Sequence, residues 1–532
     1  MFNRRLIKDL MGEYPFILDI YWQLMAKNRP WSAHYNLDGL APVLPQAIID
    51  AKTARESAPK GKQIFIFASL HYWIEETMMI GLALAGMGHE VTFGYLPFAD
   101  WSEPMSKFDI RKQDLYSKNI LGQAESLMKI VSFVDVKVSQ GASTPQLEKI
   151  AEEVSIFDAQ YTLQVEEIER VNSLYKLRYE RNFQAAMAFK TWLGSNKPDI
   201  VIVPNGTIQE MGVLYQVSRM MDFKTVTFEF GDQKERIWMA QNSEIMRQDT
   251  DDLWHELGRK PITEEHHQTL IDLYAARKNA RLWRNFARQW QEVPTGGAKE
   301  LRNALGLDER PVLMLATNVL GDSLTLGRQV ISNTMAEWIL STLQVLINRE
   351  DIQLVVRVHP GEMLTNGTSM VEVINSAYPK LPEFVHLIRP EDKTNTYDLI
   401  EITDIGLVYT TTVGLEMAMA GIPVIVAGQT HYKGRGFTHD PINWEEYLSL
   451  LDKLLSDHKI YRLNEKAIEL AWRYSYLFFF EFPFVFPWHL VYFKEDIQSR
   501  SVAYVLSEKG QKKYGEAFRY LTGEEKDYSF SN

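Results

Sequence analysis

Short apolar runs of β-forming residues, each followed by a polar turn and a helical pattern, are the feature that most limits how this chain can fold. The first run is QIFIFASL (63–70), and HEVTFGYL (89–96) follows after one helical segment. After a mostly helical stretch come KPDIVIVPNG (197–206) and KTVTFEFG (224–231). Strands that are apolar throughout and alternate with helices predict a parallel sheet covered by helices on both faces.

The same alternation starts again near residue 310. It is carried by further apolar runs at 311–319, 352–360, 385–390, 403–410 and 422–428. Two such alternations predict an α/β fold with two tandem Rossmann-like domains. The 532 residues fit this reading, because a chain of that length exceeds one ordinary core.

These patterns divide the chain into four predicted parts. A helical extension (1–60) precedes a first Rossmann-like domain (61–290), which carries a helical insertion at about 100–190. A second Rossmann-like domain (300–457) follows. The helical and aromatic segment 458–532 is expected to pack on the domains.

Composition excludes several classes of function. The formal net charge of −12 argues against a general binder of nucleic acid or of anionic membranes, although a local basic pocket stays open. The chain has no cysteine, so disulfides, thiol catalysis and thiolate metal sites are excluded. This fits a reducing compartment, and we expect the protein in the cytoplasm.

Two segments bear on membranes. The first 22 residues begin basic, but Glu13, Pro15 and Asp19 interrupt the apolar stretch, so we do not expect a signal peptide. The aromatic segment YSYLFFFEFPFVFPWHLVYF (474–493) also contains charges and prolines. We expect it to be buried against the domains. The alternative is a peripheral contact of this segment with the inner face of the cytoplasmic membrane.

Polar residues end one strand of the second domain in the run LVVRVHPGE. Arg357 lies within the strand, and His359 stands at its end, where Pro360 fixes the backbone. Open α/β sheets bind ligands beyond the carboxyl ends of their strands, so these cations could bind a phosphate or diphosphate. The alternative is a turn in which the histidine only hydrogen-bonds to the backbone.

A hydroxyl cluster ends another strand, in YTTTVGLEMAMAG. Thr410, Thr411 and Thr412 precede a short helix whose N–H groups, together with the hydroxyls, could hold a phosphate. Thr411 or Thr412 could equally be only an N-cap. Glu416 lies one helical turn beyond Thr412, where a carboxylate suits a ribose diol.

Two loops at the same predicted edge add polar groups. ATNVLGDS (316–323) offers Asn318 and Ser323, and HYKGRGFTHD (431–440) offers Lys433 and Arg435 between glycines. Two cations in a glycine-containing loop suit an anionic donor, although a solvated surface loop has the same composition.

In this order, the motifs resemble the donor-binding half of GT-B glycosyltransferases, most closely the capsular-polysaccharide biosynthesis and Kdo-transferase-like group. The matching residues are Arg357-Val-His359-Pro360 and Thr411-Thr412-Val-Gly414-Leu-Glu416 through Gly421-Ile-Pro423. CDP-glycerol glycerophosphotransferases are similar more distantly. Threonines stand where that group more often has serines, which leaves the identity of the donor open.

The resemblance implies roles for these residues. His359 and the Thr411-Thr412 turn would hold the phosphates of a nucleotide sugar, and Glu416 its ribose. The resemblance implies no metal and no other cofactor. We interpret the D-x-D at Asp249–Asp252 as a helix cap with solvated charges, and residues 264–267 (EEHH) as a polar first turn without metal-ligand spacing.

In such a transferase the first domain would bind the acceptor and supply a catalytic base. His71 follows the first strand, and Glu75 and Glu76 stand in the next turn. An imidazole suits deprotonation of a hydroxyl, whereas the alternative is a helix-capping histidine with carboxylates that favour a helix N-terminus. Further candidates at strand ends are Asn205, Glu229 and Asp232, with Glu229 as an alternative base.

The sequence therefore predicts a nucleotide-sugar-dependent glycosyltransferase whose acceptor is a cell-surface polysaccharide or glycolipid precursor. Its predicted partners are the donor and a glycan or glycolipid acceptor, not nucleic acid. Three alternatives remain at this point: a CDP-glycerol-type polyol-phosphate transferase, a sugar-nucleotide epimerase, and a catalytically silent GT-B-like binding module.

Overall fold

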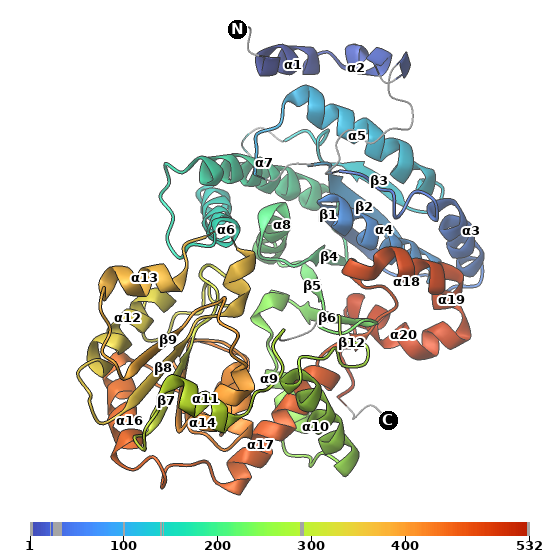
Figure 1. Ribbon diagram of the computed structural model, residues 1–532. Helices are drawn as coiled ribbons and strands as arrows, with labels where there is room; N and C mark the ends of the chain where they lie inside the picture. Colours follow the sequence, from blue (N-terminus) through green and yellow to red (C-terminus); the bar gives the residue numbers. More distant parts are fainter. Residues whose placement is uncertain are drawn as a thin grey trace. The chain divides into compact units, whose positions relative to one another are not determined.

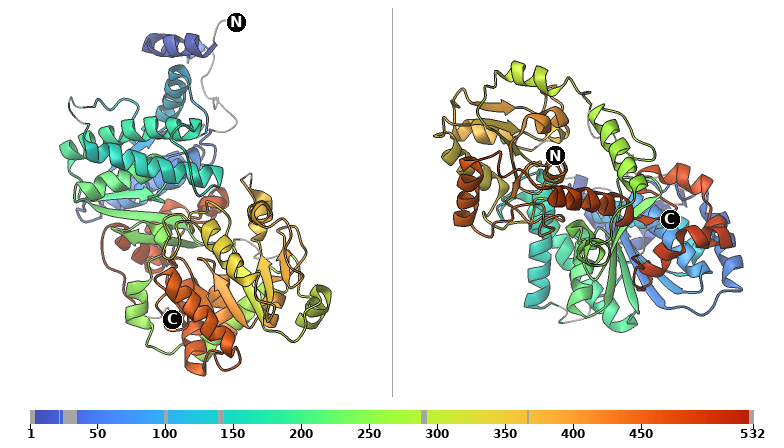
Figure 2. Two further views of the ribbon diagram at one scale, coloured as in Figure 1. Left: turned by 90° about the vertical axis from the view of Figure 1, so that its left-hand side faces the viewer. Right: turned by 90° about the horizontal axis from the view of Figure 1, so that it is seen from below.

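The computed structural model describes residues 4–21, 23–24, 35–98, 102–138, 141, 143–287, 292–365 and 367–528. The chain forms two compact units. Unit 1 comprises Met1–Ala159, Glu169–Met246 and Pro483–Asp527, and unit 2 comprises Gln160–Ile168, Arg247–Phe482 and Tyr528–Asn532. Each unit has its own sheet with helices on both faces (Figures 1 and 2).

Unit 1 is built on a seven-stranded sheet of order β12-β6-β5-β4-β1-β2-β3. The strands are β1 (Gln63–Ser69), β2 (Glu90–Leu96), β3 (Lys129–Ser132), β4 (Ile200–Pro204), β5 (Lys224–Phe230), β6 (Arg236–Gln241) and β12 (Phe484–Val485). The pairs among β1 to β5 are parallel, and β6 and β12 extend the sheet in antiparallel pairing.

The two faces of β1 show why an all-apolar strand forms here. Phe65 stacks on Trp192 of α7 (Ser173–Asn196), with ring centroids 4.1 Å apart, and Phe67 contacts Phe189 of the same helix. On the other face, Ile66 lies beside Gly81 of α4 (His71–Gly86). Because helices cover both faces, the six successive side chains from Ile64 to Ser69 are buried, and Gln63 at the start of the strand is exposed.

The remaining helices of unit 1 surround this sheet. They are α1 (Arg4–Gly12), α2 (Pro15–Tyr21), α3 (Leu44–Arg55), α5 (Lys107–Leu121), α6 (Pro145–Leu163), α8 (Gln209–Met220), α18 (Phe493–Ser499), α19 (Val502–Leu506) and α20 (Glu508–Leu521). The last residues of α6 are assigned to unit 2.

Unit 2 contains a five-stranded parallel sheet of order β11-β10-β7-β8-β9. Its strands are β7 (Val312–Ala316), β8 (Gln353–Arg357), β9 (Val385–Ile388), β10 (Ile405–Val408) and β11 (Val424–Val426). Alternate residues enter different clusters: Val312 and Met314 pack in one, Leu313 and Leu315 in the other. The sheet therefore separates two apolar cores, as a doubly wound fold requires.

The helices of unit 2 supply the outer layers of those cores. They are α9 (Asp251–Leu257), α10 (Glu264–Lys278), α11 (Ala298–Leu305), α12 (Met335–Leu346), α13 (Met370–Ala377), α14 (Thr396–Ile402), α15 (Val413–Met419), α16 (Trp444–Ser456) and α17 (Glu465–Tyr476). A 3-10 turn, η4 (Pro360–Leu364), follows β8, and a π-helical turn, η5 (Leu477–Glu481), continues α17.

The predicted fold class is confirmed: the protein is α/β, with two Rossmann-like units, one with a parallel sheet and one whose parallel strands β1 to β5 are extended by two antiparallel strands. Two elements are shorter than the sequence predicts, since the run IVSFVDVKV (130–138) is strand-like throughout and 327–349 has a helical pattern. The strand expected at 130–138 is limited to β3, which ends at Ser132. The helix expected at 327–349 begins only at Met335, where the Thr334 hydroxyl accepts a hydrogen bond from the Glu337 N–H and caps it.

The compact units divide the chain at other positions than the predicted domains. Residues 247–287 pack in unit 2, although a boundary near 290 was expected. Pro483–Asp527 returns to unit 1, where β12 pairs with β6. A short segment before α7 belongs to unit 2, where the Glu166 carboxylate accepts hydrogen bonds from the N–H groups of Met335 and Ala336. These segments pack against residues that are far away in the sequence. Local sequence patterns do not predict such long-range contacts.

The aromatic segment 474–493 is packed inside the protein, as expected. Phe478, Phe484, Phe486 and Trp488 are each at most 4% exposed. The alternative, a membrane contact through this segment, is not supported, because these aromatic rings pack inside the protein. Within the described residues, no helix has both the length and the apolar character needed to cross a bilayer.

This packing makes a testable prediction for stability. Trp488 is fully buried in unit 1 and donates its Nε1–H to the Arg500 carbonyl, whereas Val491 is 62% exposed. We expect Trp488→Ala to lower the free energy of unfolding by about 3–5 kcal/mol, because it opens a cavity. Val491→Ala, the control, should change it by less than about 0.5 kcal/mol in chemical denaturation. Equal effects of the two substitutions would contradict the packing.

Candidate active-site residues

The carboxyl ends of β10, β7 and β8 form the polar edge of unit 2. In a sheet of this order, β7 and β10 flank the topological switch point, where open α/β sheets bind ligands. Asn318 follows β7, and its Oδ1 accepts hydrogen bonds from the Thr410 N–H (3.3 Å) and hydroxyl (3.2 Å). The structure thus brings together two residues that are 92 positions apart in the sequence.

His359 lies at the same edge, one strand away. Its backbone N–H donates to the Thr317 hydroxyl, which ties the ends of β8 and β7 together. Its Nδ1 accepts the Gly361 N–H at 3.0 Å and caps η4. Because Nδ1 is an acceptor, the neutral ring carries its proton on Nε2, and this nitrogen is a donor suited to a phosphate oxygen. The cap and the ligand role are compatible, since they use different nitrogens.

The threonine turn precedes α15, and its hydroxyl groups differ in their contacts. Thr412 occupies the N-cap position, but its side chain makes no capping hydrogen bond. The Thr411 hydroxyl accepts the Val413 N–H at 3.5 Å, and the Thr411 carbonyl accepts the Tyr432 hydroxyl at 2.6 Å. The turn is therefore held from its backbone side, and a simple N-cap does not account for the Thr412 hydroxyl.

Glu416 lies in a different environment from the one expected for a ribose ligand. It is 8% exposed, and its Oε1 accepts hydrogen bonds from Arg277 of α10 and Tyr397 of α14, both at 3.0 Å. Burial raises the pKa of Glu416, and the Arg277 charge opposes that rise. The guanidinium also lies 4.6 Å from the centre of the Phe479 ring. A buried, paired carboxylate of this kind stabilises the packing of α15.

Two predicted cations are engaged internally. Arg357 is buried and donates to the carbonyls of Arg389 and Thr394, and burial lowers its pKa to about 10. Arg435 pairs with Asp251 at 2.5 Å and donates to the Thr250 hydroxyl. Both side chains brace loops through their terminal nitrogens, whereas the buried Nε of each has no hydrogen-bond partner among the described residues.

Two other predicted residues are less constrained. The Ser323 hydroxyl bonds to the adjacent Asp322 carboxylate at 3.1 Å. The Lys433 ammonium is half-buried and lies 3.5 Å from the Pro441 carbonyl. The hydrogen bonds do not link either side chain to the other predicted ligands.

His431 was not singled out from the sequence, yet it is the most unusual polar residue near this edge. Its ring stacks on Phe478 with centroids 3.9 Å apart, and its Nδ1 lies 2.9 Å from the Tyr474 hydroxyl. Its Nε2 is buried without a hydrogen-bond partner, and burial together with the charges of Arg328 and Arg435 lowers its pKa to about 3. The dipeptide His431-Tyr432 carried no recognisable signal, because these partners come from distant segments.

Unit 1 has its own group of buried carboxyls near the carboxyl ends of its strands. The Glu229 carboxylate, at the end of β5, accepts hydrogen bonds from Asn205 Nδ2 (2.8 Å) and the Phe230 N–H (3.2 Å). Burial raises its pKa to about 7. Glu76 is 1% exposed, and burial with the nearby charges of Glu229 and Asp496 raises its pKa well above its usual value. Asp496, from the returning C-terminal segment, could not be assigned from the sequence.

The other base candidates differ in what they contact. His71 begins α4 and is half-buried, and burial lowers its pKa. It does not cap the helix, since the N-cap position is Leu70, without a side-chain cap. Glu75 is buried, and its Oε1 accepts the N–H groups of Gly39 (2.7 Å) and Leu40 (2.9 Å). Glu75 therefore anchors the segment before α3.

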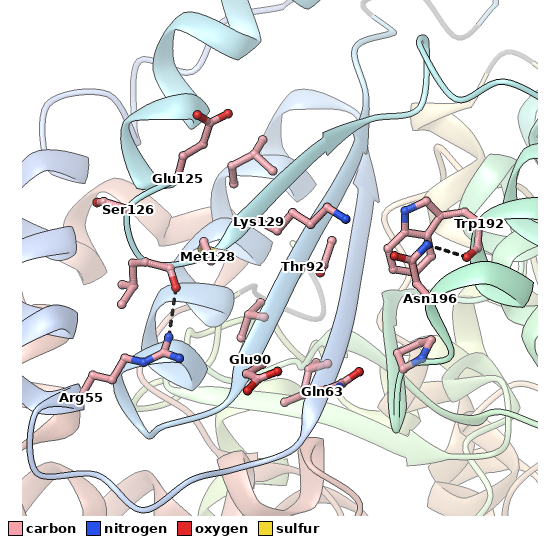
Figure 3. Close-up of a pocket in the computed structure, with 15 residues that line it drawn as sticks. Arg55, Gln63, Glu90, Thr92, Glu125, Ser126, Met128, Lys129, Trp192 and Asn196 are labelled. Carbon is pink, nitrogen blue, oxygen red and sulfur yellow. Dashed lines mark hydrogen bonds between the residues drawn. The ribbon is translucent and has the colours of Figure 1, made fainter.

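A cavity of about 620 Å³ lies elsewhere in unit 1, at the amino ends of β1, β2 and β3 (Figure 3). Gln63, Glu90, Thr92 and Lys129 line it on the strands, and Trp192 stands at its side. None of the predicted site residues lines this cavity. Ligands of open α/β sheets bind at the opposite, carboxyl edge, so we do not assign the chemistry to it.

The acidic clusters behave as helix starts. Asp251 begins α9, and the Asp249 carboxylate accepts its N–H at 2.9 Å. Thr263 caps α10, and His266 completes a reciprocal capping box. Among the residues that the structure describes, no group of three or more acidic or histidine side chains is arranged to hold a metal ion.

Two Rossmann-like units in one chain, with polar side chains at the switch point of the second, are the features of a GT-B-like protein. Residues 288–463 match the family described as capsule polysaccharide biosynthesis protein. Over this stretch, the match confirms the predicted resemblance to the capsular-polysaccharide group. No curated protein sequence matches the chain.

Solved structures give further, weaker similarities. A β-Kdo 2,4 transferase, KpsC of Thermosulfurimonas dismutans, is 18% identical, and the match covers 52% of this chain and 78% of that one with a TM-score of 0.35. The β-Kdo 2,7 transferase of the same KpsC is 16% identical over 57% and 87% of the chains, with a TM-score of 0.31. UDP-GlcNAc 2-epimerase from Neisseria meningitidis is 14% identical over 77% and 95%, with a TM-score of 0.25. At these TM-scores the similarities define no activity.

The Glu416–Arg277 pair makes a second prediction. Arg277→Met would leave a carboxyl group buried without its cation, and we expect it to lower the free energy of unfolding by about 3–5 kcal/mol. Arg284→Met is the control, since the Arg284 side chain is 59% exposed, and it should cost less than about 0.5 kcal/mol. Adding Glu416→Gln to Arg277→Met should recover part of the loss in urea denaturation. Equal effects of the two single substitutions would contradict the assignment of the pair to packing.

Proposed function

We propose that the protein is a glycosyltransferase that moves a sugar from a nucleotide-sugar donor to a hydroxyl of a cell-surface polysaccharide or glycolipid precursor. In this proposal unit 2 binds the donor, and unit 1 binds the acceptor and supplies the base. The proposed location is the cytoplasm, where nucleotide sugars are made.

The observation that carries the proposal is a set of hydrogen bonds that connects the ends of three strands of unit 2. Thr410 of the turn after β10 bonds to Asn318 after β7, and the His359 N–H bonds to Thr317 after β7. These bonds gather hydroxyls and a ring N–H donor at the switch point, where phosphates bind in doubly wound sheets. The family match covers the whole of this region.

We assign the phosphate contacts to the Thr411 and Thr412 hydroxyls and to His359 Nε2, with Ser323 and Lys433 as further donors. Glu416, Arg357 and Arg435 then act as positioning residues, because their polar groups already bind protein partners. This departs from the ribose role that the resemblance implies for Glu416.

The reaction breaks the bond between the anomeric carbon and the donor phosphate oxygen, and the electron pair leaves with the nucleotide. The acceptor oxygen bonds to the anomeric carbon, and its proton passes to the base. Hydrogen-bond donors directed at the departing phosphate stabilise the charge that develops there. His359 Nε2–H and the threonine hydroxyls are such donors.

For the base we favour Glu229, with His71 as the alternative. A general base works best when its pKa lies near the working pH, and burial places the pKa of Glu229 at about 7. Glu75 is less suited, because its carboxylate is occupied by two backbone N–H groups.

The central test is turnover with a panel of UDP-, GDP-, CDP- and CMP-sugars. We expect one of them to release nucleotide, with transfer of the sugar to an acceptor. His359→Ala and Thr412→Val should leave the fold unaltered. Each should weaken nucleotide binding about tenfold or more in calorimetry, because each removes a hydrogen bond to a charged phosphate. Arg349→Ala, in an exposed surface pair, serves as the control with unchanged affinity.

Other outcomes of the same panel identify the alternatives. Transfer of a polyol phosphate would indicate the CDP-glycerol type of enzyme, and conversion of the donor without an acceptor would indicate an epimerase. Binding without turnover would indicate a silent module. Unchanged nucleotide affinity in both variants would remove the proposed phosphate site.

The base assignment predicts a pH dependence. Glu229 must be ionised to accept a proton, so kcat/KM should rise with pH through about 7, its raised pKa. The Asn205 amide lowers that pKa, and Asn205→Gly removes it at a position where φ is 58°, which glycine tolerates. The rising limb should then move to higher pH. Glu75→Gln should leave the limb in place, and a limb that Asn205→Gly does not move would exclude Glu229 as the base.

A further inference from the structure

The first two helices of unit 1 are amphipathic in an unusual orientation. A helix that packs on its own domain normally turns its apolar stripe toward the core. Here the polar side of α1 faces α5: Lys8 bonds to Asp109 at 2.9 Å, and the Asp9 carboxylate accepts the Lys107 N–H at 2.8 Å. Glu13, just after α1, pairs with Lys107. Figure 1 shows both helices along the outer side of α5.

Close contact at two points fixes this orientation. A Cβ on Gly12 would lie 2.5 Å from the Phe108 nitrogen, so only glycine lets the end of α1 approach α5 this closely. On α2, the Tyr21 ring contacts the Phe108 ring at a centroid distance of 5.6 Å. The side of the helix pair that carries the polar residues and Gly12 therefore packs against α5.

The opposite side carries an exposed apolar row, which we call the outer row. Its members are Ile7 (44% exposed), Leu10 (59%), Tyr14 (54%), Phe16 (59%), Ile20 (53%) and Leu24 (76%). Ile7 and Leu10 are spaced i, i+3 on α1, and Phe16 and Ile20 are spaced i, i+4 on α2, so each pair lies on one helical face. Tyr14 stands between the two helices, and Leu24 follows α2. The Tyr14 and Phe16 rings meet edge to face at 6.0 Å and join the two pairs. The row is therefore continuous across the turn between α1 and α2.

We infer that the outer row is a docking surface for an anionic lipid bilayer, in which α1 and α2 lie in the plane of the headgroups. Helices with one apolar face bind lipid in this way, with aromatic rings at the boundary. Helices of nine and seven residues are far too short to span the bilayer, which needs about 20 residues. The inference does not depend on the proposed function.

Local charge favours this occupant. The segment 4–24, which contains α1 and α2, has three basic and three acidic residues, and α5 has four basic residues against two acidic ones. These helices therefore carry a positive surplus in a chain whose net charge is −12. Basic residues near the surface attract anionic headgroups, whereas the rest of the acidic chain is repelled and stays in the water.

The area of the row argues against a second copy of this chain as the occupant. Six side chains that are each about half exposed offer roughly 600 Å², given that a large aromatic side chain covers at most about 250 Å². A stable protein interface needs about 800 Å² from each partner. The outer row is too small and too narrow to hold a stable dimer, but a lipid surface needs no matching shape.

The test is co-sedimentation of the full chain with vesicles of phosphatidylcholine, with and without phosphatidylglycerol. We expect the protein to sediment with the anionic vesicles, and Leu10→Glu/Phe16→Glu to lower its partition coefficient at least tenfold. The matched control is Leu364→Glu/Ile460→Glu, which places the same charges at exposed apolar positions of unit 2 (92% and 74% exposed) and should bind as the unaltered chain does. All four positions are exposed, so thermal unfolding should be unchanged.

Three results would overturn the inference. The unaltered chain could fail to sediment with either vesicle, or both double variants could lose binding equally. Alternatively, sedimentation velocity without lipid could show a dimer that only Leu10→Glu/Phe16→Glu abolishes, which would assign the row to a second copy. Nucleotide release by the soluble protein should be the same in all variants, so this test and the test of the proposed function fail separately.

Discussion

Burial of the central strands on both faces is the constraint on which the rest of this structure depends. Phe65 and Ile66 are neighbours in β1, yet one packs against α7 and the other against α4. The backbone polar groups of such a strand can bond only to neighbouring strands, and β1 pairs in parallel with β2 on one side and β4 on the other. Polar side chains that could bind a ligand are therefore found at the strand ends, because the side chains within the strands are buried in the apolar cores.

The ends of these strands carry buried polar groups in two arrangements. In unit 2, Asn318, Thr317 and the threonine turn satisfy one another through hydrogen bonds and keep donors at the switch point. In unit 1, burial raises the pKa of both Glu229 and Glu76, and the nearby charges of Glu229 and Asp496 add to the rise for Glu76. Burial without a cation costs stability, and groups kept at such a cost are typical of catalytic sites. Glu416 differs, since Arg277 offsets its burial.

Much of the fold could be predicted from the sequence. The predictions that differ from the structure do so for one shared reason. The strands were recognisable because each is a continuous apolar run that ends in a polar turn, a purely local pattern. The unit boundaries were not, because β12 pairs with β6 across more than 240 residues and Glu166 caps a helix that begins at Met335. Both contacts are made by residues whose neighbours in sequence reveal nothing about them.

The candidate site divides along the same line. The sequence by itself determined that hydroxyls and a histidine stand at the carboxyl ends of parallel strands, because strand order along the chain and the direction of parallel strands require it. Only the tertiary structure decided which of them are already bound to protein partners. Partners from distant segments bind the side chains of Arg357, Arg435 and Glu416. His431 is buried beside Tyr474 and Phe478. The outer row of α1 and α2 faces away from the protein. Residue type and spacing set the chemistry that is available, whereas packing between distant segments sets which groups are already satisfied.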